Sequence, residues 1–357
     1  MPCLFDSFTI KSVTLRNRIG VSPMCQYVSN DGMATDWHLV HLGARAVGGA
    51  GLIIAEATAV APRGRISPGD AGLWSDQHIE PLVRINSFVS KHGSVPGIQL
   101  AHAGRKASAA RPWEGDHSLT EEEGGWETIA PSALAFGDKL WKVPKEMTIQ
   151  DIMEVQDAFA SAACRALDAG YKWLELHAAH GYLCHSFYSP ISNKRTDQYG
   201  GSLENRCRFT VETLGRIRAV WPDALPLAVR ISCSDWVEGG WTIDESIELA
   251  RKLKDAGADL IDCSSGFGSP DHRKYPFGPG WQVHFSEAIK KNVEIATAAV
   301  GLITDPVQAN EIISSGKADI ALLAREMLRD PYWPHRAAKA LNVSLKKIAP
   351  APYAHWI

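Results

Sequence analysis

Apolar and polar residues follow one repeating order along this chain. A stretch with helical spacing of apolar residues ends at a glycine-containing turn, and a short apolar run that ends in polar residues comes next. The order is clearest where Val47-Gly-Gly-Ala-Gly51 precedes residues 52–56, and where Asp168-Ala-Gly170 precedes residues 171–177. Glycine accepts the left-handed conformation that closes a helix, and all-apolar runs are typical of parallel strands covered on both faces. The pattern therefore predicts alternating helices and buried strands.

Eight apolar runs are predicted to be strands. They cover residues 19–23, 52–56, 95–100, 171–177, 225–231, 259–264, 293–298 and 319–325. Helix starts are marked by Thr148-x-x-Asp151 and by the capping box Thr242-x-x-Glu245. Eight such units in 357 residues predict an α/β fold, the (β/α)8 or TIM barrel, with residues 1–357 as a single domain. An open doubly wound sheet is the alternative, which the missing Gly-x-Gly-x-x-Gly after the first strand weakens.

Two segments are longer than ordinary loops. Residues 104–146 follow the third predicted strand, and residues 181–202 follow the fourth. Both come after the carboxyl ends of strands, where barrel enzymes place the loops that bind substrate. We therefore expect both segments to border the active site.

Composition narrows the class of protein. The formal charge of −3 offers no electrostatic reason to bind nucleic acid or an anionic membrane. No run of about 18 apolar residues is present, so we expect no membrane span, and the first residues lack the pattern of a signal peptide. The seven cysteines are scattered without a Cys-x-x-Cys pair, which argues against a disulfide framework or a structural zinc site. A cytoplasmic enzyme is the expectation.

Polar residues gather at the ends of the predicted strands, and burying them together costs free energy unless something binds there. They are Ser22, Cys25, Glu56, Gln99, His102, His177, His180, Arg230, Ser264 and Arg325. The segment His177-Ala-Ala-His180-Gly-Tyr182 directly follows a strand, and two imidazoles with a phenol suit binding a carbonyl oxygen and moving a proton. The alternative is a metal-dependent hydrolase or lyase in which Glu56 or Asp262 joins the two imidazoles as a third ligand.

Six motifs occur in order from the first predicted strand to the last. They are Ser22-Pro-Met-Cys-Gln-Tyr27, Glu56-Ala-Thr58, Gln99-Leu-Ala-His-Ala-Gly-Arg-Lys106, His177-Ala-Ala-His-Gly-Tyr182, Asn193-Lys-Arg-Thr-Asp-Gln-Tyr-Gly-Gly-Ser202 and Ala324-Arg-Glu326. Together they resemble the Old Yellow Enzyme family of flavin ene-reductases. The cysteine in Pro23-Met-Cys25 resembles the thermophilic-like, or class III, subgroup that includes xenobiotic reductase A.

The resemblance implies an FMN cofactor at the strand ends. Gln99 would contact the flavin pyrimidine edge, and Arg230 would place a positive charge where reduced flavin is anionic. Cys25 would lie beside the ring and modulate its potential, and the cofactor would also contact His177. The remaining implied contacts are backbone groups of Ser22, Pro23, Met24 and Ala57 along the ring, and Gly301, Ala324 and Arg325 at the phosphate. The family usually has glycine where Ala324 stands.

The resemblance also implies the substrate residues. His177 and His180 would donate hydrogen bonds to the carbonyl oxygen of an enone, and Tyr182 would deliver a proton to the α-carbon. Lys106 would ease formation of the phenolate, and Tyr27 would bound the pocket. NADPH, or NADH, would reduce FMN and leave before an alkene conjugated to a carbonyl, imide or nitro group binds, which gives ping-pong kinetics without a metal. The non-enzymatic alternative is a protein that stores or senses flavin.

The carboxyl-terminal tail, about residues 345–357, carries a separate expectation. Its end, Ala349-Pro-Ala-Pro-Tyr-Ala-His-Trp356, combines two prolines with aromatic residues. In the resembled subgroup this end reaches the active site of a neighbouring subunit. The resemblance therefore implies a homodimer or tetramer in which Trp356 lines the partner's pocket, whereas the alternative is a tail folded onto its own barrel.

Overall fold

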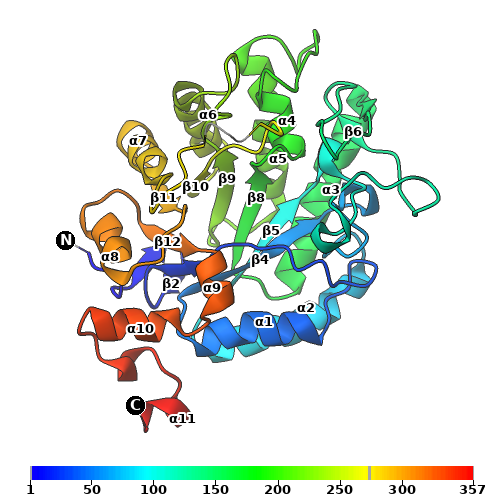
Figure 1. Ribbon diagram of the computed structural model, residues 1–357. Coiled ribbons are helices and arrows are strands. Elements are labelled where there is room, and N and C mark those ends of the chain that lie inside the picture. Colours follow the sequence, from blue (N-terminus) through cyan, green and yellow to red (C-terminus); the bar gives the residue numbers. More distant parts are fainter. Residues whose placement is uncertain (1, 272–274, 357) are drawn as a thin grey trace.

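The computed structural model describes residues 2–271 and 275–356, and its centre is a closed barrel of parallel strands (Figure 1). Around the barrel the strands follow the order β10, β11, β12, β3, β4, β5, β8, β9. Their bounds are β3 Ile19–Val21, β4 Leu52–Ala59, β5 Val95–Ala101, β8 Trp173–Ala178, β9 Leu227–Ser232, β10 Leu260–Ser264, β11 Ala296–Ala299 and β12 Ile320–Leu323. Each overlaps one predicted strand, so the (β/α)8 prediction is confirmed and the open sheet is wrong.

Helices surround the barrel (Figure 1). Their bounds are α1 Asp36–Val47, α2 Ile79–Lys91, α3 Ile149–Asp168, α4 Leu183–Tyr188, α5 Leu203–Val220, α6 Ile243–Asp255, α7 Val283–Val293, α8 Pro306–Ser314, α9 Arg325–Arg329, α10 Trp333–Ala340 and α11 Ala351–Ala354. The predicted caps are present, because Thr148 Oγ1 accepts from Asp151 N–H and Thr242 Oγ1 from Glu245 N–H. The main core lies between the outer strand faces and the helices. None of the described helices is long and apolar enough to cross a membrane.

An amino-terminal hairpin closes the end of the barrel opposite the strand carboxyl ends. Strands β1 (Phe8–Ile10) and β2 (Val13–Leu15) pair antiparallel. Val13 and Leu15 pack in one cluster with inward-facing residues of the barrel, including Leu52 and Trp173. The repeating pattern did not predict this hairpin, because two three-residue strands are too short to show alternation. The plug makes this end a packed core and leaves the opposite end for binding.

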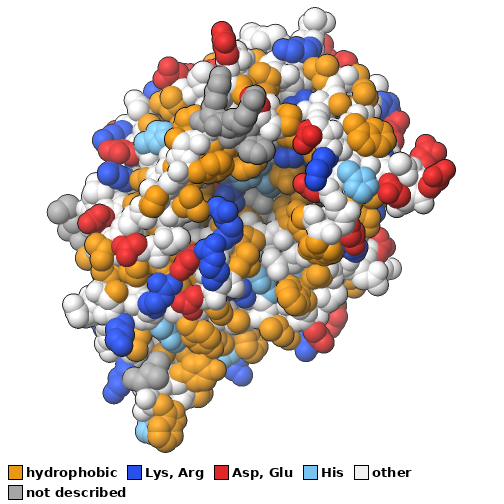
Figure 2. All heavy atoms as spheres, in the orientation of Figure 1, with side chains coloured by type: hydrophobic (Ala, Val, Ile, Leu, Met, Phe, Trp, Pro, Cys, Tyr) orange, Lys and Arg blue, Asp and Glu red, His pale blue; other side chains and the backbone are white. Residues whose placement is uncertain are grey.

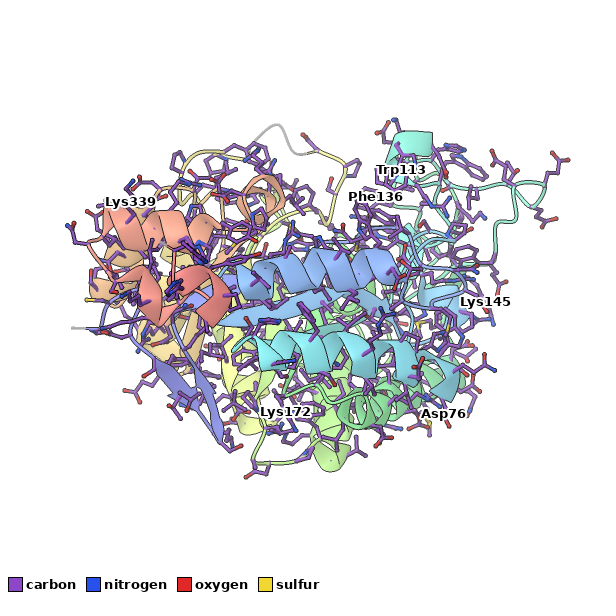
Figure 3. The ribbon with its side chains drawn as sticks, turned by 90° about the horizontal axis from the view of Figure 1, so that it is seen from below. Asp76, Trp113, Phe136, Lys145, Lys172 and Lys339 are labelled. Carbon is purple, nitrogen blue, oxygen red and sulfur yellow. The ribbon has the colours of Figure 1, made fainter. Side chains whose placement is uncertain are left out.

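The two long segments border the carboxyl ends of the strands. Residues 104–146 contain the 3-10 turns η3 (Gly104–Lys106) and η4 (Pro112–Glu114) and the short parallel pair β6 (Ile129–Ala130) and β7 (Lys145–Glu146). Residues 181–202 contain α4. In the view of Figure 3, Trp113 and Phe136 of the first segment lie at the side of the molecule away from Lys339 of α10. The tail with α11 projects from the lower edge of the molecule in Figure 1.

Candidate active site

A layer of charged and polar side chains lies inside the barrel, above the apolar plug. Glu175 and His177 share the face of β8 that carries the inner residue Trp173, because side chains alternate along a strand. The Nε2 of Gln99 donates to Glu175 Oε1 over 2.7 Å. All three polar side chains are buried. Burial, with the negative charge of Asp262, raises the pKa of Glu175 to about 8, although Arg230 opposes the rise.

Arg230 supplies the fixed positive charge of this layer. Its Nε lies 3.1 Å from Asp262 Oδ2, and its Nη1 donates to Ser22 Oγ over 3.0 Å. Burial raises the pKa of Asp262 to about 6, and the guanidinium opposes that rise. Because Asp262 binds Arg230 and is fully buried, it does not join the two imidazoles as a metal ligand.

The predicted imidazoles and phenol do come together. The ring centres of His177 and His180 are 5.3 Å apart, and those of His177 and Tyr182 are 4.9 Å apart. Burial lowers the pKa of both histidines well below the usual value, and Arg230 adds to this effect. Both rings are therefore neutral at pH 7, and each carries one N–H. The Nδ1 of His177 accepts from Ala179 N–H over 3.2 Å, so its proton resides on Nε2.

His180 has a different partner. Its Nε2 lies 2.6 Å from Ser264 Oγ at the end of β10. One ring nitrogen of His180, a residue expected to contact the substrate, is thus hydrogen-bonded within the protein. Sequence reasoning placed Ser264 at the same barrel end but did not predict that it would bind His180.

Lys106 lies beside the phenol, as expected. Its Nζ is 5.0 Å from the centre of the Tyr182 ring and donates to His180 O over 2.9 Å. Burial lowers the pKa of Lys106 to about 7, and Arg105 contributes to the decrease. Burial raises the pKa of Tyr182 well above its usual value, which keeps the hydroxyl protonated at neutral pH. A protonated phenol beside an amine that titrates near neutrality can act as a proton donor.

Cys25 and Tyr27 form the side of the site next to β3. Burial raises the pKa of the Cys25 thiol well above its usual value, so the thiol is uncharged at neutral pH. Tyr27 is a neighbour of this thiol, and burial also raises the pKa of its hydroxyl. Tyr27 further contacts Trp113 edge to face, with ring centres 6.0 Å apart. This contact joins the first predicted strand end to the long segment after β5.

Two cavities of about 360 Å³ each meet at this end of the barrel. Figure 2 shows this face, where Lys and Arg side chains lie beside a central hollow. One cavity is lined by Arg230, Gly301, Ala324 and Arg325. The other is lined by Tyr27, Lys106, Asp116, Phe136 and Tyr182. Phe267 borders both. Cavities of this size are typical of sites for small molecules.

The first cavity has the features expected of an anion site. Arg325 is exposed, and its side chain forms no ion pair or hydrogen bond with the rest of the described chain. Gly301 has φ +126°, and a Cβ there would lie 3.1 Å from Gln282 N, so glycine leaves backbone room. Ala324 has φ −103°, outside the left-handed region, so alanine is tolerated where the family usually has glycine.

Two predicted strand-end residues lie elsewhere. A bulge in β4 between Ala55 and Ala57 interrupts the alternation, and Glu56 contacts His38 of α1 over 3.2 Å. Glu56 is therefore not a ligand beside His177. His102 is buried against Gly64. Within residues 2–271 and 275–356, no group of three or more His, Cys, Asp or Glu side chains could hold a metal ion.

The tail residue Trp356 lines neither cavity of its own chain. It is 83% exposed and contacts the ring of His355. Sequence reasoning missed Glu175, Asp116, Phe136 and Phe267. Glu175 could have been found, because a charged residue two positions before His177 in an apolar strand must face the same side.

Comparisons with known proteins agree with this geometry. Residues 3–344 match the family model of the NADH:flavin oxidoreductase / NADH oxidase family. An NADPH dehydrogenase of Geobacillus sp. (strain WCH70) is 49% identical over 96% of this chain and 95% of its own. One of Bacillus subtilis (strain 168) is 47% identical over 98% and 97%. The old yellow enzyme homologue from Zymomonas mobilis superposes with a TM-score of 0.79 at 26% identity, covering 99% of this chain and 98% of its own.

Proposed function

We propose the following roles for the residues of this chain, which belongs to the NADH:flavin oxidoreductase / NADH oxidase family. It is an FMN-dependent ene-reductase that takes its electrons from NAD(P)H. The acceptors are alkenes conjugated to a carbonyl, imide or nitro group. The observation that carries the proposal is the packing of a protonated phenol, Tyr182, against a neutral imidazole, His177, beside a cavity.

The residues of the barrel end fit the cofactor that the family uses. Gln99 and Arg230 would hold the flavin pyrimidine end, where the buried guanidinium can balance an anion. The cavity that Gly301 and Ala324 line would hold the phosphate, with the guanidinium of Arg325 as its counter-charge. Backbone groups of residues 22–24 and Ala57, together with Cys25 and His177, would line the ring. FMN when bound supplies a hydride acceptor and donor.

The protein's own residues then activate the alkene. His177 Nε2–H donates to the substrate's carbonyl oxygen, where negative charge grows as hydride arrives at the β-carbon. One such preorganised donor is worth about 3 kcal/mol. His180 joins this role by releasing Ser264, and Tyr27 and Phe136 bound the cavity. Tyr182 protonates the α-carbon, and Lys106 stabilises the phenolate that results.

Half-reactions measured separately test this assignment. Tyr182→Phe should slow oxidation of the reduced enzyme by 2-cyclohexenone about 100-fold, because general acid catalysis contributes about that much or more. The rate at which NADPH reduces the FMN should stay close to that of the unmodified protein. Equal losses in both half-reactions would remove Tyr182 from the role of proton donor. A protein that binds FMN but oxidises no NADPH would instead be a flavin-storing or sensing protein.

We further propose membership of the thermophilic-like subgroup, a cytoplasmic location, and a homodimer or tetramer in which Trp356 enters the partner's pocket. The support is that Trp356 is an exposed aromatic residue at a distance from the cavities of its own chain. Deleting residues 353–357 should raise the KM for the alkene while FMN stays bound. Unchanged steady-state kinetics would refute the tail's contribution, and sedimentation would report the assembly.

A further inference from the structure

The turn that carries both His180 and Tyr182 adopts an unusual backbone. His180 has φ +59° and Gly181 has φ +76°, two consecutive left-handed residues. A side chain at Gly181 is excluded, because a Cβ there would lie 2.3 Å from Phe267 O. The left-handed conformation is unfavourable for a non-glycine residue such as His180. Contacts with the rest of the protein must therefore hold this turn.

Two backbone N–H groups of the turn form hydrogen bonds with side chains. His180 N donates to Ser232 Oγ over 2.9 Å. The next amide, Gly181 N, donates to His185 Nδ1 over 2.7 Å. Along the chain this amide lies between His180 and Tyr182, so the bond to His185 restrains the backbone that carries both side chains.

The other ring nitrogen of His185 contacts Asp235. Its side chain and that of Asp235 are both fully buried, and its Nε2 lies 2.9 Å from Asp235 Oδ1. The other carboxylate oxygen of Asp235 accepts from Ser189 Oγ over 2.6 Å and from Trp241 N over 2.8 Å. Burial acts to raise the pKa of Asp235, but His185 and these donors outweigh it and lower the pKa. Asp235 is thus a buried carboxylate whose Oδ2 accepts two hydrogen bonds and whose Oδ1 faces His185 Nε2 at ion-pair distance.

The hydrogen bond from Gly181 determines the tautomer of His185. Because Nδ1 accepts from Gly181 N–H, the ring proton resides on Nε2, which faces the carboxylate. The packing is close: a Cβ at Gly268 would lie 2.5 Å from Asp235 Oδ1 and 3.0 Å from His185 Cε1. The ring therefore has little freedom to change its orientation.

We propose that His185, fixed by Asp235, is a positioning residue that holds the His180-Gly181-Tyr182 turn and thereby aims the Tyr182 hydroxyl at the α-carbon of the alkene. His185 does not touch the substrate in this scheme. The inference rests on the proposed function, because it assumes that Tyr182 is the proton donor.

Acceptor choice separates a positioning role from a purely structural one. Reduction of 2-cyclohexenone needs a proton at carbon, whereas reduction of 1,4-benzoquinone does not. His185→Phe should lower the rate with cyclohexenone about tenfold, since misplacing a reacting group by a fraction of an ångström has effects of this order. The rate with benzoquinone should change less than twofold. His185→Gln should recover most of the loss, because its amide can accept from Gly181 N and donate to Asp235.

Asn86→Leu is the matched control. Asn86 is buried, and its Nδ2 donates to Ala169 O over 2.8 Å, away from both cavities. This variant also loses one buried hydrogen bond, so it should lower the unfolding midpoint but leave the ratio of the two acceptor rates unchanged. If it shifts that ratio as much as His185→Phe does, the effect is general destabilisation and the proposal is wrong.

A double-mutant cycle with Tyr182→Phe decides the question. If His185 acts through the phenol, His185→Phe should have almost no further effect on cyclohexenone reduction once Tyr182 is Phe. Independent, multiplicative effects would overturn the proposal. Should His185→Phe not fold, Asp235→Asn enters the same cycle with a loss of about threefold. Failure of the unmodified enzyme to reduce cyclohexenone would instead overturn the proposed function, and is seen before any variant is made.

Discussion

Lys106 gives the sharpest prediction, because its charge should change within the working pH range. Burial, with help from Arg105, lowers its pKa to about 7. The ammonium form, which predominates below that pH, lies 5.0 Å from the Tyr182 ring. Its attraction for a phenolate over that distance is about 3 kcal/mol at an effective dielectric constant of about 20. With the proton about half transferred, roughly 1.5 kcal/mol remains, or about tenfold in rate.

The rate of the alkene half-reaction should fall as pH rises. The lysine is charged below about pH 7 and neutral above it, so the alkene half-reaction should slow about tenfold as pH rises from 6 to 8.5. Lys106→Met should be slow at every pH and show no step. Stopped-flow oxidation of the reduced enzyme by 2-cyclohexenone, followed from pH 6 to 8.5, measures this rate for the unmodified enzyme and for Lys106→Met.

Lys139→Met is the control for this experiment. Lys139 lines the same cavity, but it is exposed and donates to Gly115 O over 3.1 Å. The control should keep the pH step of the unmodified enzyme. A wild-type rate that rises with pH, or a step that survives in Lys106→Met, would refute the electrostatic reasoning.

Three further outcomes are expected. Arg230→Met should lower the free energy of unfolding by about 3–5 kcal/mol, because it leaves Asp262 buried without its partner. Urea denaturation of the FMN-free protein measures this free energy, and a loss below about 1 kcal/mol would contradict the prediction. Gly181→Ala should fold poorly or lose alkene reduction, since its Cβ would lie 2.3 Å from Phe267 O; unchanged kinetics would argue against a fixed turn. Dialysis against EDTA should leave NADPH oxidation unchanged, and a loss restored by a divalent metal would revive the metal-dependent alternative for His177.

The barrel could be predicted because its signals are local. Each strand is a run of apolar residues after a glycine turn, and such runs need no distant partner to be recognised. Errors arose where a distant contact decides the structure. The bulge beside Ala55 turns Glu56 away from the barrel interior toward α1, and no feature of the apolar run marks it. The hairpin β1–β2 is likewise stabilised by packing in the barrel rather than by its own sequence.

The part of the site that lies at the strand ends was predictable for the same reason as the barrel. Residues at strand ends, such as His177 and Arg230, could be grouped because parallel strands end together. Residues of the long segments could not, because their positions depend on contacts across the sequence. Arg105 Nη2, for example, donates to Gly268 O over 2.8 Å, and this bond fixes the segment that carries Phe136 against the loop after β10. His185 was overlooked because its partner, Asp235, is 50 residues away in the sequence.

The two cations of the site explain why His177 should not contribute to the pH dependence. Burial lowers the pKa of His177, and both Arg230 and Lys106 lower it further. The imidazole therefore stays neutral over the working range and keeps its single N–H for a carbonyl oxygen. Arg230 is paired with Asp262 at 3.1 Å, whereas Lys106 has mainly carbonyl oxygens as partners and can lose its proton. Substitution of Lys106 should accordingly abolish the step near pH 7, and a step that persisted would have to come from Asp262 or Glu175 in the layer below.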